Sequence, residues 1–271
     1  MKKFVTLALA ALMTLSLVSC APKPTDSLAD KKTFTVGFDA EFPPYGYKDE
    51  SGEYVGFDLS LAEEVAKRNG WELKKAAISW DSKDMELSAG NIDCIWNGFT
   101  MNGREDEYTW SEPYVDNSQV FVVPADAGIA DWAGLAGKIV AVQADSSALK
   151  ALQDEENQEN LDLAASFKEL SQCADYNTAF MDLDAGAVDA IAMDIGVANY
   201  QISGRGADNY VILEKTLASE QYAIGFLKGN TALRDQVQKT LDQMVEDGTA
   251  DTIVETWAKN GLAAASVTLG K

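Results

Sequence analysis

The chain has 271 residues, a formal net charge of −21 and no histidine. A protein this acidic is repelled by nucleic acid and by anionic lipid headgroups, which excludes nucleic-acid binding. The absence of histidine removes Ser-His-Asp and Cys-His catalysis and histidine-based metal sites, and nothing else in the sequence indicates a metal or a cofactor.

The first residues have the form of an export signal. Lys2 and Lys3 precede an apolar run from Phe4 to Val18, which is shorter than the roughly 20 residues that a membrane-spanning helix needs. The run leads into Leu17-Val18-Ser19-Cys20, the pattern of a bacterial lipobox. We therefore predict a signal peptide at 1–19, a lipid anchor on Cys20 and a flexible linker at 20–32. An ordinary secretory signal followed by a chance cysteine is the alternative.

The mature chain of about 240 residues suffices for two modest domains. Strand-like and helix-like patterns alternate along it, which indicates α/β architecture. In the first part we predict strands over 33–38, 71–78 and 93–99, a helix from its cap at Asp58 to Gly70, and a short helix over 81–88.

The pattern restarts after the apolar run 120–123, as if a second α/β unit were inserted into the first. Here we expect a short helix near Trp132, a strand over 138–143, a helix from about Ser146, a helix over 176–184 and a strand over 189–194. The chain then closes with a strand over 222–228, a helix from Thr231 to Gly248 and a last helix up to Asn260.

Besides Cys20, the chain has Cys94 and Cys173, which fall into different parts of this organisation. An exported protein can join two cysteines in a disulfide. Their separation favours two unpaired thiols instead.

Five separated segments resemble the bacterial extracellular solute-binding proteins of family 3, the amino-acid-binding periplasmic proteins and lipoproteins of ABC importers. The segments are Val36 to Tyr45 (with Asp39-Ala40-Glu41-Phe42-Pro43-Pro44), Gly56-Phe57-Asp58-Leu59, Gly90 to Tyr114 (with Asn97-Gly98-Phe99-Thr100 and Arg104), Leu135 to Ser147, and Ala185 to Asp194. Their order and spacing match over most of residues 33–260. One such motif is weak evidence for membership of the family, but five motifs in the same order and spacing are strong evidence.

The resemblance implies an α/β, two-lobed periplasmic-binding-protein-like fold of type II, with a helix-flanked β-sheet in each lobe and a two-segment hinge. Lobe 1 would comprise 33–117 and 222–262, and lobe 2 would comprise 118–221. It also implies an extracytoplasmic, monomeric receptor that delivers a free amino acid to an ABC transporter permease.

The resemblance also places the ligand-binding residues, and the chemistry of a zwitterion agrees with it. Arg104 would hold the α-carboxylate with two parallel hydrogen bonds, and Asp194 the α-ammonium. Further hydrogen bonds would come from Asn97, Gly98 and Thr100 in one lobe and from Ser146 and Ser147 in the other. The alternatives are a solvated surface arginine, and helix caps for Asp194 and both serines.

Three more residues would contact the ligand side chain. Phe42 and Trp80 match positions where the family holds that side chain between aromatic rings, although both also suit a core. Asp39 matches a position facing the side-chain end, so a cationic or neutral polar amino acid is favoured over an acidic one.

The sequence departs from the family pattern in two places. Three residues separate Thr100 from Arg104, one fewer than usual, which bears on the reach of the arginine. Asp145 stands where the family has glycine before the serine pair.

We predict a binding protein and no enzyme. A dehydratase-like enzyme of the same fold, with Glu41 or Asp39 as acid-base group, is one alternative, and an amino-acid sensor acting through a partner is another.

Overall fold

The structure is a computed structural model that describes residues 28–271. The predicted signal peptide at 1–19, the lipobox with Cys20 and the linker up to residue 27 lie outside the described residues. Between residues 28 and 271, no helix has both the length and the apolar character needed to cross a membrane.

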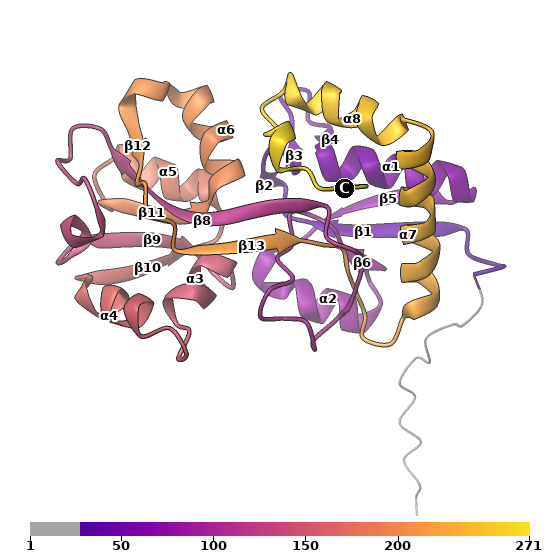
Figure 1. Ribbon diagram of the computed structural model, residues 1–271, viewed down its shortest axis with the longest axis horizontal. Coiled ribbons are helices and arrows are strands. Elements are labelled where there is room, and N and C mark those ends of the chain that lie inside the picture. Colours follow the sequence, from indigo (N-terminus) through magenta and orange to yellow (C-terminus); the bar gives the residue numbers. More distant parts are fainter. Residues whose placement is uncertain (1–27) are drawn as a thin grey trace, which may run out of the picture.

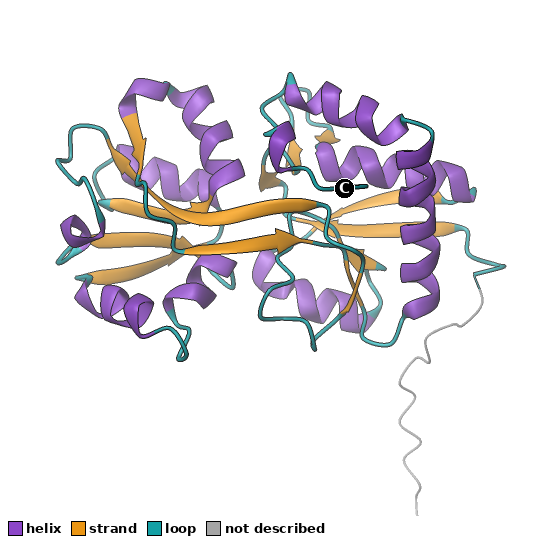
Figure 2. Cartoon of the chain, viewed as in Figure 1, coloured by secondary structure: helices purple, strands orange, loops and turns teal. Residues whose placement is uncertain are grey.

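The chain folds into two halves, each built on a β-sheet with helices against it (Figures 1 and 2). Two antiparallel strands, β8 (Val115–Pro124) and β13 (Ala218–Tyr222), run from one half toward the other. The predicted α/β fold of two helix-flanked sheets joined by two chain segments is confirmed.

The first sheet has the strand order β5-β1-β6-β14-β7. Its strands are β5 (Glu72–Ala77), β1 (Thr33–Phe38), β6 (Cys94–Ile95), β14 (Gly225–Phe226) and β7 (Thr109–Trp110). The first three strands are parallel, and β14 is antiparallel to both of its neighbours. This sheet therefore takes its strands from both ends of the described chain.

The second sheet has the order β10-β9-β11-β8-β12, with β13 also paired to β8. Its further strands are β10 (Glu169–Cys173), β9 (Ile139–Gln143), β11 (Ala190–Asp194) and β12 (Tyr210–Ile212). The inner strands β9 and β11 are parallel and carry almost only buried apolar residues, as a sheet covered on both faces requires. All of its strands come from the middle of the chain.

Helices cover both sheets, and a small third sheet joins the first half. The helices are α1 (Phe57–Asn69), α2 (Lys83–Ala89), α3 (Ser147–Leu152), α4 (Gln158–Ser166), α5 (Tyr176–Asp184), α6 (Ile195–Arg205), α7 (Thr231–Glu246) and α8 (Thr249–Ala258). Short 3₁₀ turns span Trp80–Ser82, Trp132–Leu135, Ala207–Asn209 and Ala264–Ser266. The small sheet consists of β2 (Glu41–Phe42), β3 (Gly46–Lys48) and β4 (Tyr54–Val55).

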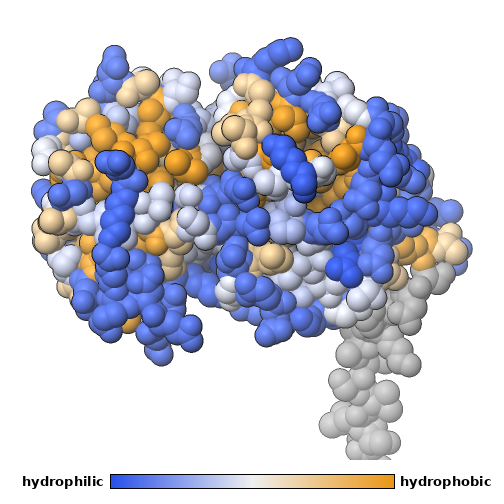
Figure 3. Space-filling model, in the orientation of Figure 1, coloured by the Kyte–Doolittle hydropathy of each residue, from blue (hydrophilic) through white to orange (hydrophobic). Residues whose placement is uncertain are grey.

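Most predicted elements are confirmed, because their apolar periodicity matches a buried face. The helix α7, for example, buries Leu233, Val237 and Leu241 at helical spacing and presents a hydrophilic outer face (Figure 3). The predicted strands over 33–38 and 189–194 and the helix over 176–184 also lie where expected, as β1, β11 and α5.

Three predictions about local structure were wrong. The strand expected over 93–99 ends at Ile95, because the following residues leave the sheet as a loop. The strand expected over 222–228 divides between β13 and β14, which belong to different sheets. Asp58 does not cap α1, since the helix starts at Phe57 and the capping position is Gly56, where a Cβ would lie 2.0 Å from the carbonyl oxygen of Tyr45.

The two cysteines of the described chain lie on different sheets. Cys94 is buried in β6 and Cys173 is half-buried in β10, and neither is in a disulfide. Burial raises the pKa of the Cys94 thiol well above its ordinary value. Both residues are therefore thiols in this structure, as their separation in the sequence favours.

Candidate functional site

Arg104 lies on the loop that follows β6. Its Nη1 donates to Ser147 Oγ at 3.0 Å and to the carbonyl of Thr100 at 3.3 Å, and its guanidinium carbon is 5.4 Å from the centre of the Phe99 ring. The loop is closed by a hydrogen bond of 2.9 Å from the Arg104 N–H to the carbonyl of Met101. The shortened loop thus still delivers the arginine, which is only 6% exposed, to a residue of α3 in the other half.

Asp194 lies at the carboxyl end of β11 and is 4% exposed. Its Oδ1 accepts hydrogen bonds from Asn117 Nδ2 at 2.9 Å, from Gln119 Nε2 at 2.7 Å and from the Tyr222 hydroxyl at 2.7 Å. The residue stands at the capping position of α6, yet its side chain makes no capping hydrogen bond. The carboxylate is therefore directed to the two crossing strands β8 and β13 rather than to the helix.

The two serines have different surroundings. Ser146 Oγ accepts the N–H of Leu149 at 3.2 Å and so caps α3. Ser147 Oγ accepts the hydrogen bond from Arg104 and holds that guanidinium in place. The expected helix cap is thus present at Ser146.

Asp39 connects the two halves. Its Oδ2 accepts a hydrogen bond of 2.6 Å from Gln143 Nε2 at the end of β9, and its own N–H donates to Asn97 Oδ1 at 2.8 Å. Burial raises the pKa of Asp39 to about 6, against the opposing effect of hydrogen bonds from the Glu41 N–H and Gln143. The Asp39 carboxyl therefore holds its proton more strongly than the carboxyl of an exposed aspartate does.

The loop segment 97–100 is shaped for close approach. Gly98 has φ of +56°, and a Cβ there would lie 2.8 Å from Cε1 of Phe42 and 2.9 Å from Cε2 of Tyr222. The Gly98 N–H donates to Asp58 Oδ2 at 2.6 Å, and Asp58 also accepts from the Tyr114 hydroxyl at 2.7 Å. The Asp58 carboxylate, which was expected to cap α1, thus holds this loop in place through the Gly98 N–H.

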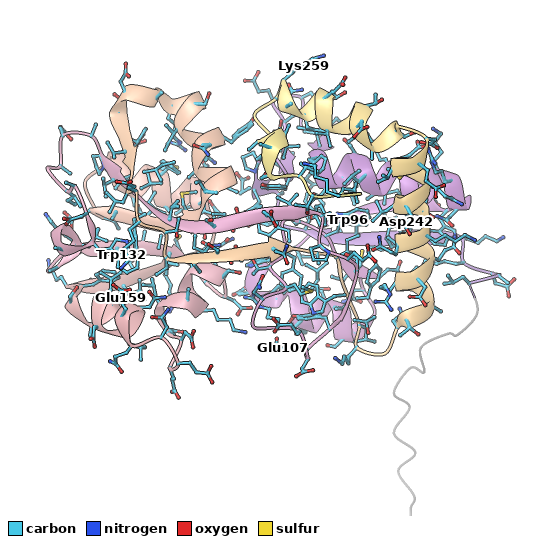
Figure 4. All side chains as sticks on the ribbon, viewed as in Figure 1. Trp96, Glu107, Trp132, Glu159, Asp242 and Lys259 are labelled. Carbon is cyan, nitrogen blue, oxygen red and sulfur yellow. The ribbon has the colours of Figure 1, made fainter. Side chains whose placement is uncertain are left out.

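The three aromatic residues Phe42, Trp80 and Trp96 have different surroundings. The Phe42 ring lies 6.1 Å from the Tyr176 ring, which comes from α5 in the other half. Trp80 is half-buried, and the centre of its ring lies 5.5 Å from the centre of the Phe99 ring, with the two rings nearly perpendicular. Trp96 is fully buried in the interior of its half, where Figure 4 labels it.

Sequence reasoning missed Glu220, which is 6% exposed in β13. Its Oε1 accepts from Asn117 Nδ2 at 2.6 Å and from Gln119 Nε2 at 2.7 Å, so it shares both donors with Asp194. Burial, and secondarily the charge of Asp194, raise the pKa of Glu220 to about 7. The available signal was period-two alternation with Tyr222, which places both side chains on the inner face of β13.

Other residues that the sequence did not single out complete the boundary between the halves. Gln143 contacts Asp39, Lys83 at the start of α2 forms an ion pair with Asp145, and Lys150 donates to the Gly103 carbonyl. Asp145 has φ of +56°, a conformation in which glycine is favoured. The departure from the family glycine therefore adds an ion pair between the halves at a cost in backbone strain.

A cavity of about 760 Å³ lies between the halves, and it collects only some of the predicted site residues. Thr100, Arg104, Ser146 and Ser147 line it, together with Glu220 and the ion pair of Lys83 and Asp145. Asp39, Phe42, Trp80, Asn97, Gly98 and Asp194 do not line it. Asp194 is nevertheless joined to the cavity wall, because it shares both amide donors with Glu220.

These features define a class of protein: two α/β halves joined by crossing strands, with charged and hydrogen-bonding side chains where the halves meet. Residues 34–260 match the sequence profile of the bacterial extracellular solute-binding proteins, family 3, and the chain belongs to this family. It is an extracytoplasmic amino-acid-binding protein of an ABC uptake transporter, in a family that binds solutes and does not transform them.

Known relatives agree over almost the whole chain. The arginine-binding extracellular protein ArtP of Bacillus subtilis (strain 168) is 28% identical over 261 residues, which cover 95% of this chain and 98% of ArtP. An ABC uptake transporter substrate-binding protein from Streptococcus pneumoniae with bound histidine has a TM-score of 0.79 and 30% identity, and the match covers 85% of this chain and 94% of that one. An ancestral arginine-binding protein bound to arginine has a TM-score of 0.76 and 32% identity, with 84% and 98% coverage.

Proposed function

We propose that this protein captures a cationic α-amino acid between Arg104 and Asp194 and presents it to a membrane permease, while a lipid on Cys20 holds it at the membrane. The observation that carries the proposal is a set of buried charges without counter-ions. Within residues 28–271, neither Arg104 nor Asp194 forms an ion pair, although both are almost completely buried. An uncompensated charge costs several kcal/mol on burial. A zwitterion supplies both missing charges.

The preference for a cationic ligand rests on the remaining buried carboxyls. The α-carboxylate would neutralise Arg104, and the single positive charge of the α-ammonium would offset only one of the neighbouring carboxyls Asp194 and Glu220, which together with Asp39 leaves an excess of buried negative charge among the described residues. A second positive charge on the ligand compensates part of this excess, whereas an acidic side chain adds to it. The names of ArtP and of the ancestral protein mention arginine, which makes arginine the first candidate.

A thermal-shift screen tests this proposal. The full chain is unfolded and refolded to remove any carried ligand and is then heated with each of the twenty amino acids. A ligand at 100 times its Kd stabilises a protein by about 2.7 kcal/mol, which corresponds to roughly 5–10 °C for a chain of this size. We expect the largest shift with arginine or lysine. If no amino acid raises the Tm, the capture proposal fails; if glutamate gives the largest shift, the charge argument fails.

The lipid anchor has its own test. A Cys20→Ser variant should lose incorporation of labelled fatty acid and leave the membrane fraction, because no other thiol stands at the predicted cleavage site. A variant that stays acylated and membrane-bound would overturn the lipobox interpretation.

We further propose that the protein works as a monomer whose lobes, 33–117 with 222–262 and 118–221, close on the ligand. These boundaries are supported by the sheets, because the first sheet takes its strands from both ends of the described chain and the second from its middle. The boundary at 117 falls within β8, and the boundary at 222 falls at the end of β13. Small-angle scattering with and without arginine should show a monomer that becomes more compact on binding. A dimer, or unchanged dimensions, would contradict this arrangement.

A further inference from the structure

The buried carboxyl groups of Asp194 and Glu220 lie next to each other where β11 and β13 flank β8. Asp194 in β11 stands opposite Gln119 of β8, and Glu220 in β13 stands opposite Asn117 of the same strand. The Asn117 and Gln119 amides each donate to both carboxyls, at 2.6 to 2.9 Å. This brings two acidic side chains from opposite neighbours of β8 to one place.

No positive charge compensates this pair within the described residues, since neither carboxyl is in an ion pair. The groups that face the pair are the hydroxyls of Tyr45, Tyr176 and Tyr222, the Thr100 side chain and, along the cavity wall, Arg104. Nor do residues 28–271 gather three acidic or cysteine side chains that would hold a metal ion. Two carboxyls in such surroundings cannot both ionise easily, which favours one proton shared between them when no ligand is bound.

The polar atoms around the pair indicate what it is arranged to hold. Gln119 is 0% exposed, and its Oε1 has no hydrogen-bond partner, although its Nε2 donates to both carboxyls. The two carboxyls are hydrogen-bond acceptors held side by side by shared amide donors, an arrangement that suits a group with several N–H donors and a positive charge.

We infer that Glu220 is a second acidic ligand of the substrate α-ammonium, beside Asp194, and that the ammonium replaces the proton that the two carboxyls share. The inference rests on the proposed capture of an amino acid and assigns a role to a residue outside the resemblance. Binding then releases up to one proton to the solvent. Affinity accordingly rises with pH until the pair is ionised without ligand, and it levels off above that point.

The burial of Glu220 sets the pH range. Its pKa is raised to about 7, mainly by desolvation, and burial also raises the pKa of Asp194. An ammonium between the two groups favours their charged forms and lowers both values. Affinity should therefore increase by up to tenfold per pH unit between about pH 5 and 7.

The experiment is calorimetric titration of the full chain with L-arginine from pH 5 to 8.5, in two buffers with different heats of ionisation. L-glutamine serves as a second probe with a neutral side chain. We expect proton release with both, because the α-ammonium is common to them. In Glu220→Gln, which keeps the shape and an acceptor oxygen, we expect at least tenfold weaker binding at pH 8 and a flat pH profile.

The matched control is Asp116→Asn. Asp116 lies on β8 one residue before Asn117, is exposed, and accepts a hydrogen bond from the Gln221 side chain. The substitution therefore removes a negative charge from the same pair of strands, but outside the cleft. Its Kd and proton release should equal those of the wild type.

Three outcomes have distinct meanings. If the wild type binds neither probe at any pH and no amino acid raises its Tm, the capture proposal itself has failed. If the wild type binds without releasing protons near pH 6.5, the inference is overturned, and this result needs no variant to fold. If Glu220→Gln keeps the wild-type affinity and pH slope, Glu220 only ties β13 to β8, and the inference is again overturned.

Discussion

Replacement of Arg104 by alanine separates ligand recognition from folding. In the proposed complex the guanidinium holds the ligand carboxylate, and in the unliganded protein it is a buried charge without an ion-pair partner among the described residues. Its removal takes away the binding partner of the ligand but leaves no protein charge newly unpaired. Affinity should therefore collapse while the free energy of unfolding of the unliganded protein changes little.

The structure sets the size of the effect. Breaking a buried charge pair by removing one partner costs about 3–5 kcal/mol, or roughly 150-fold to 4,000-fold in Kd. Arg104 lines a cavity of about 760 Å³ into which water can follow the ligand, so the lower end applies. The lost hydrogen bond to Ser147 Oγ should change unfolding by about 1 kcal/mol.

Calorimetric titration with L-arginine measures the affinity, and urea unfolding measures the stability. The matched control is Arg205→Ala, because the Arg205 guanidinium also lies over a phenylalanine ring, 5.0 Å from the centre of Phe180, but pairs with Asp184 away from the cavity. The control should bind arginine normally. An Arg104→Ala variant that folds and binds within threefold of the wild type would refute the reasoning, since the carboxylate would then be held elsewhere.

Three further predictions concern other parts of the site. Asp145→Gly removes the counter-ion of Lys83, whose side chain is 1% exposed, so arginine binding should weaken about tenfold and urea unfolding should show lower stability, because relief of the left-handed backbone strain offsets only part of the cost of an unpaired buried charge; an unchanged Kd would contradict a role for this ion pair in holding the halves together. Gly98→Ala places a methyl group 2.8 Å from the Phe42 ring at a positive φ, so Kd should rise at least tenfold and the Tm fall, whereas wild-type values would show that the loop adapts. The unliganded protein should lose stability from about pH 4 to 7, because buried carboxyls with raised pKa values favour folding only while protonated, and urea midpoints that rise with pH would exclude this account. The carboxyls with values of about 6 to 7 are Asp39, Asp58 and Glu220.

The sequence alone predicted the parts of the molecule that depend on neighbours along the chain. Apolar periodicity located β1, β11 and α5, since a strand or helix that buries one face must repeat with its own period. The motif around Arg104 predicted an arginine at the cleft, and the structure shows it buried there, with Ser147 as its partner from the other half.

Where the chain leaves a sheet depends on contacts that the local sequence does not contain. The segment after Ile95 reads as a continuing strand because Trp96 and Phe99 are apolar, but the Gly98 N–H within it donates to Asp58, a residue of α1. The Asp58 carboxylate accepts this N–H from within the first turn of α1, one residue past the start of the helix, so it does not stand at the capping position.

Only the tertiary structure identified Glu220 as part of the site. In the sequence it is one glutamate among many acidic residues of a protein with a net charge of −21, and its alternation with Tyr222 is the only local sign that its side chain points inward. Its burial and its shared donors arise because β8 lies between β11 and β13, which brings residues 194 and 220 to opposite sides of one strand. The sequence gives the ordinary charge of a side chain. Whether that side chain is buried or solvated depends on which distant segments of the chain pair and pack next to it.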